Sequence, residues 1–175
     1  LKIYKLSKNY GYQRSIWTGL CQSSGDASII LDCDLQDPVE LFQDFIKNWE
    51  KGDQIVYGIR NNRQENYFIS SLRKIFYKLI NKFSENHLPL NAGDFMLIDK
   101  IIIDYIKNIN EHDIYLRGII FGFGFNRSGV KYERKKRLKG KSKFNFSNLL
   151  IFAINSFLNE GIFPLRIATI FGLVL

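Results

Sequence analysis

Two aspartates, Asp32 and Asp34, follow directly after the short apolar run 29–31. A β-branched run of this kind is typical of a strand buried on both faces of a parallel sheet. Ligands bind at the carboxyl edge of such sheets. Because the two acids are spaced two residues apart, their carboxylates can converge on one hard cation. The pattern favours a metal and phosphate site at the strand end; the alternative is that these acids form an ordinary turn before Pro38.

Two further charged residues are candidates for the site, and the first of them, Arg60, is expected at the same edge as the two aspartates. Arg60 begins a polar loop after the strand predicted at 54–58, where a positive side chain would face an anion held by the metal. Asp94 follows Gly93 in a turn that leads into a short apolar strand, and a glycine lets the backbone approach a ligand closely.

The basic residues are concentrated in one segment. The formal net charge is +8, and residues 131–143 contain eight Lys and Arg side chains against Glu133 as the single acid. We therefore expect a nearly neutral domain with one basic segment, which indicates a localised anionic partner: a phosphate, an anionic membrane surface or nucleic acid. Its Gly and Ser residues favour a mobile loop over a helix.

The elements that must position these residues alternate between strand and helix. The strand at 29–31, a helical pattern at 39–52 and the strand at 54–58 predict a βαβ unit and an α/β fold. A helix is expected before this unit, at 8–25, and two helices after it, an amphipathic one at 68–83 and a short one at 100–107. Residues 119–125 alternate large side chains with glycine, which suggests a strand or a bent, partly buried segment.

Several other chemistries are disfavoured. Two cysteines, Cys21 and Cys33, are too few for a disulfide framework or a zinc site and fit a reducing compartment. The two histidines, His87 and His112, lie in no recognisable ligand or triad spacing. The Gly122 and Gly124 pair lacks the third glycine of a dinucleotide fingerprint.

The C-terminal part is strongly apolar. Residues 146–159 predict a helix that is apolar around most of its circumference, which suggests burial at a membrane interface. Residues 167–175 form about half of the ~20 apolar residues that a membrane-spanning helix needs. Because the sequence also starts without an initiator Met or a signal peptide, we expect it to be a fragment.

Three sequence motifs follow one another along the chain. They are Asp-Cys-Asp-Leu-Gln-Asp-Pro at 32–38, Ala-Gly-Asp-Phe at 92–95, and Tyr-x-Arg-x-x-Arg-x-x-Gly-x-Ser-Lys-Phe at 132–144 before Pro-Leu-Arg at 164–166. In this order they resemble the polyprenyl-phosphate glycosyltransferases, a group that includes dolichyl-phosphate mannose synthase, within the inverting family-2 glycosyltransferases. The resemblance runs from about Leu6 to the end of the chain.

The resemblance implies a GT-A (Rossmann-like) fold with a mostly parallel sheet flanked by helices. It also implies a nucleotide-sugar donor, a polyprenyl-phosphate acceptor (undecaprenyl or dolichyl) and a location on the cytoplasmic face of the membrane, and it is compatible with a homo-oligomer. The expected divisions are an incomplete GT-A catalytic domain at 1–130, a basic mobile loop at 131–145, an amphipathic interface helix at 146–162 and the start of a transmembrane segment at 163–175.

The resemblance also implies roles for individual residues. Asp32, Asp34 and Gln36 would bind the metal and the donor diphosphate, with Asp34 and Asp94 as catalytic residues. Arg60 and Arg73 would receive the acceptor phosphate, and Arg134, Arg137 and Lys143 the donor phosphates. The chain departs from the family pattern in two places: Met96 stands where the family usually has arginine, and the family's first βαβ unit, which holds the nucleotide base, would precede Leu1.

The chemistry agrees with these residue types. A nucleoside diphosphate leaves with at least two negative charges, which Mg²⁺ or Mn²⁺ on hard carboxylates and Arg or Lys side chains can offset. The acceptor is a phosphate monoester with a second pKa of ~6, so it is already an anionic nucleophile near neutral pH. We therefore expect Asp94 to orient the reactants more than to remove a proton.

Three alternatives compete with this interpretation. A phosphohydrolase of the haloacid-dehalogenase type would use Asp32 as a nucleophile, but its motif has Thr or Val where this chain has Gln36. A nucleic-acid-binding domain would use residues 131–143 on phosphates, although the apolar tail favours a membrane surface. A polysaccharide synthase of the same superfamily would carry a Gln-x-x-Arg-Trp motif, which is absent.

Overall fold

The computed structural model describes residues 2–34, 36–61, 89, 92–109, 114–135, 169 and 172. The chain divides into two compact units, one formed by residues 1–62 and 91–138 and the other by residues 63–90 and 139–175. All the helices and strands named below belong to the first unit.

A four-stranded sheet with the strand order β1-β3-β2-β4 forms the centre of the first unit. Three of its strands carry apolar runs with the β-branched or aromatic residues that favour extended backbone. The strands are β1 (Ala27–Ile30), β2 (Ile55–Arg60), β3 (Ala92–Asp99) and β4 (Arg127–Tyr132).

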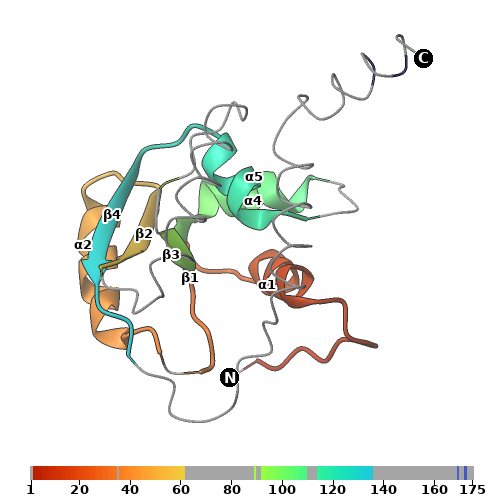
Figure 1. Cartoon of the computed structure of the whole chain (residues 1–175), viewed down its shortest axis with the longest axis horizontal. Helices are drawn as coiled ribbons and strands as arrows, with labels where there is room; N and C mark the ends of the chain where they lie inside the picture. Colours follow the sequence, from red (N-terminus) through yellow and green to blue (C-terminus); the bar gives the residue numbers. More distant parts are fainter. Residues whose placement is uncertain are drawn as a thin grey trace. The chain divides into compact units, whose positions relative to one another are not determined.

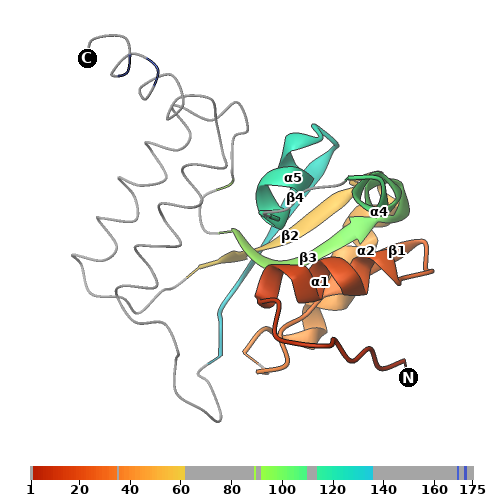
Figure 2. The ribbon, with the colours of Figure 1, turned by 90° about the vertical axis from the view of Figure 1, so that its right-hand side faces the viewer.

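The sheet is mixed. β3 lies between β1 and β2 and runs antiparallel to both, whereas β2 and β4 are parallel (Figure 2). β1 and β2 run in the same direction, as a right-handed strand–helix–strand crossover requires, but they are not neighbours. The predicted α/β fold is therefore confirmed, while the expected mostly parallel sheet is corrected to a mixed one because a later strand is inserted between the first two.

Helices cover both faces of this sheet. The 3₁₀ turn η1 (Val39–Leu41) leads into α2 (Phe42–Glu50), which packs against one face. Helices α1 (Tyr12–Cys21), α4 (Lys100–Lys107) and α5 (Leu116–Gly122) lie on the other face (Figure 1). Helix α4 starts at a capped N-terminus, where the Asp99 carboxylate accepts a hydrogen bond from the backbone N–H of Ile101 at 2.8 Å.

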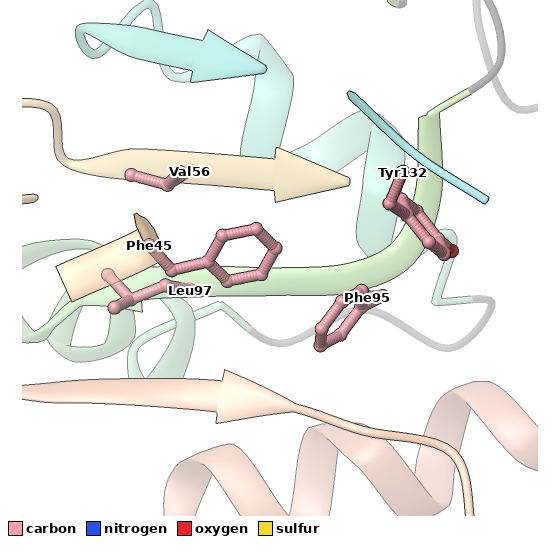
Figure 3. Close-up of a cluster of buried hydrophobic side chains, with 5 residues drawn as sticks. All are labelled: Phe45, Val56, Phe95, Leu97 and Tyr132. Carbon is pink, nitrogen blue, oxygen red and sulfur yellow. The ribbon is translucent and has the colours of Figure 1, made fainter. Parts of the chain in front are cut away.

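The core on the α2 side is built from side chains of α2 and three strands. Phe45 of α2 is fully buried, and its ring lies 4.8 Å from that of Phe95 on β3. Figure 3 shows these two rings together with the rest of the cluster, which comprises Val56, Leu97 and Tyr132. Because side chains alternate along a strand, Met96 and Ile98 point to the opposite face of β3, where they are also buried.

Two local expectations need adjustment. Residues 119–122 belong to helix α5, so a strand at 119–125 is wrong. The buried residues of α5 form two pairs at helical spacing: Leu116 and Ile120 are four residues apart, and Gly118 and Phe121 are three residues apart. Strand β4 also includes Lys131 and Tyr132, the first two residues of the segment that we expected to form a loop.

Other expectations lie outside the described residues. These are the helices at 68–83 and 146–159, and the expected interface and membrane segments at 146–162 and 163–175, apart from two isolated positions. In the parts of the chain that the structure describes, no helix has the length and apolar character needed to cross a membrane. Both cysteines are free thiols.

Candidate active site

The predicted charged residues that the structure describes lie at one edge of the sheet. The register pairs Ile30 of β1 with Met96 of β3, and Ile59 of β2 with Ala92 of β3. The carboxyl ends of β1, β2 and β4 therefore meet the amino end of β3. The chain segments that leave or enter the sheet at this edge carry Asp32 and Asp34, Arg60, Asp94 and Arg134.

The two motif aspartates converge on one point. Arg134 Nη2 lies 3.6 Å from Asp32 Oδ2 and 3.7 Å from Asp34 Oδ2. The same side chain forms a third ion pair, because its Nε lies 3.2 Å from Asp37 Oδ1, although without hydrogen-bond geometry. One guanidinium thus faces three carboxylates, so these four side chains are together net negative.

This donor set fits a magnesium or manganese ion in its chemistry. Mg²⁺ in phosphate-transfer sites is usually held by one or two carboxylates, with waters and substrate phosphates completing the shell. Asp32 and Asp34 supply two carboxylate oxygens that already face a common positive centre. Among the described residues, no group of three or more Asp, Glu, His or Cys side chains is arranged to hold a metal ion by itself.

Gln36 connects the acidic loop to the segment after β4. Its backbone N–H donates to Asp34 Oδ1 at 3.1 Å, and its side-chain amide donates to the carbonyl oxygen of Lys135 at 3.2 Å. The backbone N–H of Lys135 in turn donates to the carbonyl of Gln36 at 3.0 Å. These contacts place Arg134 over the aspartates; a metal-ligand role for Gln36 stays a prediction.

A buried hydrogen-bond network joins Asp37 to Arg60. The hydroxyl of Tyr132 donates to Asp37 Oδ1 at 2.6 Å and accepts from Arg60 Nε at 3.2 Å. Burial, together with the hydrogen bond to Asp37, raises the pKa of Tyr132 to about 12 despite the opposing effect of Arg60. The phenol is therefore a neutral donor at physiological pH, and it fixes both the acidic loop and Arg60.

Asp94 is held by an arginine from α5. Its Oδ1 accepts hydrogen bonds from Arg117 Nη2 at 2.9 Å and from Arg117 Nε at 3.2 Å. The next residue back, Gly93, lies under the guanidinium of Arg60, because a Cβ built there would be 2.9 Å from Arg60 Nη2. The Arg60 guanidinium therefore approaches the backbone of β3 at the residue before Asp94.

Tyr12 at the start of α1 contacts the acidic loop from the other side. Its hydroxyl donates to Asp32 Oδ1 at 2.9 Å. Burial and the negative charges of Asp94 and Asp32 raise the pKa of Tyr12 far above its ordinary value, although Arg117 opposes this shift. The phenol therefore remains protonated and acts as a hydrogen-bond donor.

Sequence reasoning found part of this arrangement. Of the predicted site residues, the structure brings together six: Asp32, Asp34, Gln36, Arg60, Asp94 and Arg134. The other three lie outside the described residues: Arg73, Arg137 and Lys143. Met96, which departs from the family pattern, is a core side chain and is 1% exposed.

Four side chains of the site were missed or given no role: Tyr12, Asp37, Arg117 and Tyr132. Asp37 and Tyr132 fall inside two of the quoted motifs, which is a signal that could have been used. Tyr12 and Arg117 reach the site through contacts across 20 and 23 residues of sequence, for which no local pattern exists.

The protein has an α/β fold, and carboxylates lie beside arginines at one edge of its sheet. A site of this composition is suited to phosphate-bearing ligands. The chain matches the family model described as glycosyl transferase family 2 over residues 1–106. Since this match covers more than half of the chain, the chain belongs to glycosyl transferase family 2.

Curated relatives agree with this family. The chain is 31% identical over 176 residues to an uncharacterised glycosyltransferase, YkcC, of Bacillus subtilis (strain 168), covering 100% of the chain and 54% of that protein. It is 34% identical over 169 residues to a prophage bactoprenol glucosyl transferase homolog of Escherichia coli (strain K12), covering 96% of the chain and 55% of that protein. It is also 34% identical over 168 residues to the bactoprenol glucosyl transferase of Shigella phage SfV, covering 95% of the chain and 55% of that protein. The chain thus spans about half the length of the curated relatives it matches.

Proposed function

We propose that the protein containing this chain transfers a sugar, with inversion, from a nucleotide-diphosphate sugar to a polyprenyl phosphate at the cytoplasmic face of a membrane. The observation that carries this proposal is the meeting of Asp32, Asp34 and Asp94 with Arg60 and Arg134 at one sheet edge, in a family-2 glycosyltransferase. The relatives named as bactoprenol glucosyl transferases support a polyprenyl-phosphate acceptor. Family membership favours this function over the phosphohydrolase and nucleic-acid-binding alternatives.

In the proposed reaction each charged group has a separate task. Asp32 and Asp34 would hold Mg²⁺ or Mn²⁺, which offsets the charge that develops on the departing nucleoside diphosphate. Arg134, already close to both carboxylates, is placed to contact the same phosphates. Arg60, on the other side of the site above Gly93, is placed to receive the acceptor phosphate.

Asp94 is best suited to orienting the reactants. Its carboxylate is fixed by two N–H groups of Arg117, and a phosphate monoester with a second pKa of ~6 needs no strong base to become a nucleophile. Arg117 therefore keeps Asp94 in a constant position while the acceptor phosphate attacks the anomeric carbon of the donor sugar.

Turnover of the full-length protein tests the proposal. Membranes that contain it are assayed with polyprenyl phosphate and a panel of nucleotide sugars, with and without Mn²⁺. We expect lipid-linked sugar from one donor, a loss of more than 100-fold in Asp34→Asn, and a smaller loss in Asp94→Asn. The matched control is Asp104→Asn, which removes an acid paired with Lys107 at 2.9 Å on the surface of α4.

Absence of any lipid-linked product with the whole panel would refute the proposed function. A loss in Asp94→Asn as large as that in Asp34→Asn would refute only the orienting role. Activity of wild type that is unchanged on removing divalent cations would refute the role of the metal.

A further inference from the structure

Both motif aspartates are held in the same manner. Asp34 accepts a hydrogen bond at Oδ1 from the backbone N–H of Gln36, and its Oδ2 faces Arg134 Nη2. Asp32 accepts a hydrogen bond at Oδ1 from the Tyr12 hydroxyl, and its Oδ2 faces the same Nη2 atom. In each residue one oxygen is tied to a donor and the other is turned toward a common cationic centre.

The donor to Asp34 is local, whereas the donor to Asp32 comes from another element. Tyr12 is the first residue of α1, and this helix is anchored to the body of the unit. Gln13 accepts a hydrogen bond from the backbone N–H of Leu116 at the start of α5 at 3.2 Å, and Leu20 is buried. The phenol is therefore presented from a fixed support to a carboxylate that lies on a loop.

The hydroxyl of Tyr12 is suited to this contact, because its O–H donates to the Asp32 carboxylate oxygen at 2.9 Å. The residue as a whole is 46% exposed, so its ring is not a core side chain whose loss would unfold the unit.

We propose that Tyr12 is a positioning residue that orients the Asp32 carboxylate so that Oδ2 can bind a divalent cation. This inference rests on the proposed function, because it assigns the cation site to Asp32 and Asp34. Hydrogen bonds to the outer side of metal-binding groups fix their orientation, and their removal typically weakens metal affinity by about 10- to 100-fold. Tyr12 would therefore set the cation affinity without contacting the reacting atoms.

The test compares Tyr12→Phe with Tyr10→Phe in the purified full-length protein. Tyr10 is a matched control, because it is 47% exposed and its hydroxyl bonds with Ser7 at 2.9 Å. Mn²⁺ binding is measured by electron paramagnetic resonance of the free ion, without any sugar or lipid. We expect about tenfold weaker binding in Tyr12→Phe, no change in Tyr10→Phe, and thermal unfolding midpoints equal to that of wild type.

Transfer activity at increasing Mn²⁺ supplies the second readout. We expect Tyr12→Phe to need about ten times more Mn²⁺ for half-maximal rate and to regain nearly the wild-type rate at saturation. Unchanged Mn²⁺ affinity in Tyr12→Phe, or a rate that stays low at saturating Mn²⁺, overturns the inference. Failure of the proposed function is a separate result, because it would show as a lack of sugar transfer by wild type.

Discussion

At the scale of single residues, Asp37 is the least exposed of the four acids of the site. The Asp37 side chain is 1% exposed, accepts the hydrogen bond of Tyr132 and forms an ion pair with Arg134. A buried charge is tolerated only when it is paired and hydrogen-bonded. Asp37 therefore secures the loop that carries Asp32 and Asp34, in addition to any role in binding.

Replacing Asp37 should destabilise the fold. In Asp37→Ala the buried Tyr132 hydroxyl loses its acceptor and Arg134 loses its closest carboxylate. We expect a loss of about 2–4 kcal/mol in the free energy of unfolding, since a buried partner is left uncompensated. Urea denaturation followed by tryptophan fluorescence measures this loss.

Asp44→Ala is the matched control. Asp44 pairs with Lys47 at 3.8 Å on the exposed face of α2, where such a pair contributes about 0.3–0.5 kcal/mol. If Asp37→Ala were no more destabilising than Asp44→Ala, the network around Tyr132 would not stabilise the fold.

The sequence predicted the acids of the site better than it predicted their partners. Asp32, Asp34 and Asp94 stand next to apolar strand runs, so local patterns place them at strand ends. Arg117 and Tyr12 reach these acids only through the packing of α5 and α1. Side-chain contacts of this kind depend on tertiary structure and leave no periodic signal.

At the scale of elements, β3 explains both the success and the error of the sequence interpretation. Its apolar run predicted a strand, and the helix after it, α4, has the predicted bounds of 100–107. The direction of a strand and its neighbours in the sheet depend on how the chain connects the strands. The lengths of the segments that join β3 to β1 and β2 do not determine which strand lies beside it. The antiparallel insertion brings Asp94, at the start of β3, to the end of the sheet where β1 and β2 finish.

The close approach of β2 and β3 at this edge gives a second prediction. Gly93→Ala would place a methyl group 2.9 Å from Arg60 Nη2, so the flexible guanidinium has to move while the strands stay in place. Because Arg60 is proposed to receive the acceptor phosphate, we expect the KM for polyprenyl phosphate to rise about 3- to 10-fold. The KM for the nucleotide sugar should stay within about twofold.

Initial rates at varied acceptor and donor concentrations measure this effect. Gly19→Ala is the control, because a Cβ at Gly19 in α1 meets no atom within 4 Å. That variant should leave both KM values unchanged and raise stability by roughly 0.5–1 kcal/mol, since alanine favours helix. A Gly93→Ala enzyme whose donor KM rises as much as its acceptor KM would contradict the separate role of Arg60.

At the scale of the whole compact unit, Tyr132 links parts of the chain that are distant in sequence. It ends β4, its ring packs 5.6 Å from that of Phe95 in the core, and its hydroxyl joins the Asp37 loop to Arg60 on β2. No local pattern indicates these contacts, because they depend on β4 pairing with β2 beside α2. The Tyr132 hydroxyl thus contributes both to the stability of the fold and to the geometry of the site, so its ionisation should affect both.

The stability of the unit should therefore fall in strongly alkaline solution. The pKa of Tyr132 is about 12 in the folded protein, against an ordinary value of 10.0. The neutral phenol stabilises the folded state fully below pH 10, and this contribution, on the order of 1–3 kcal/mol, is lost as the pH rises from 10 toward 12.

Thermal unfolding of wild type and Tyr132→Phe between pH 8 and pH 11.5 isolates this contribution, because the other titrating groups are common to both proteins. We expect wild type to be the more stable by a constant margin up to about pH 10, and the margin to shrink above it. A margin that stays constant to pH 11.5 would mean that the phenol has the same pKa in the folded and the unfolded protein, and a margin that widens in alkaline solution would mean that folding lowers its pKa. Either result would show that the network around Asp37 does not hold Tyr132 as the structure indicates.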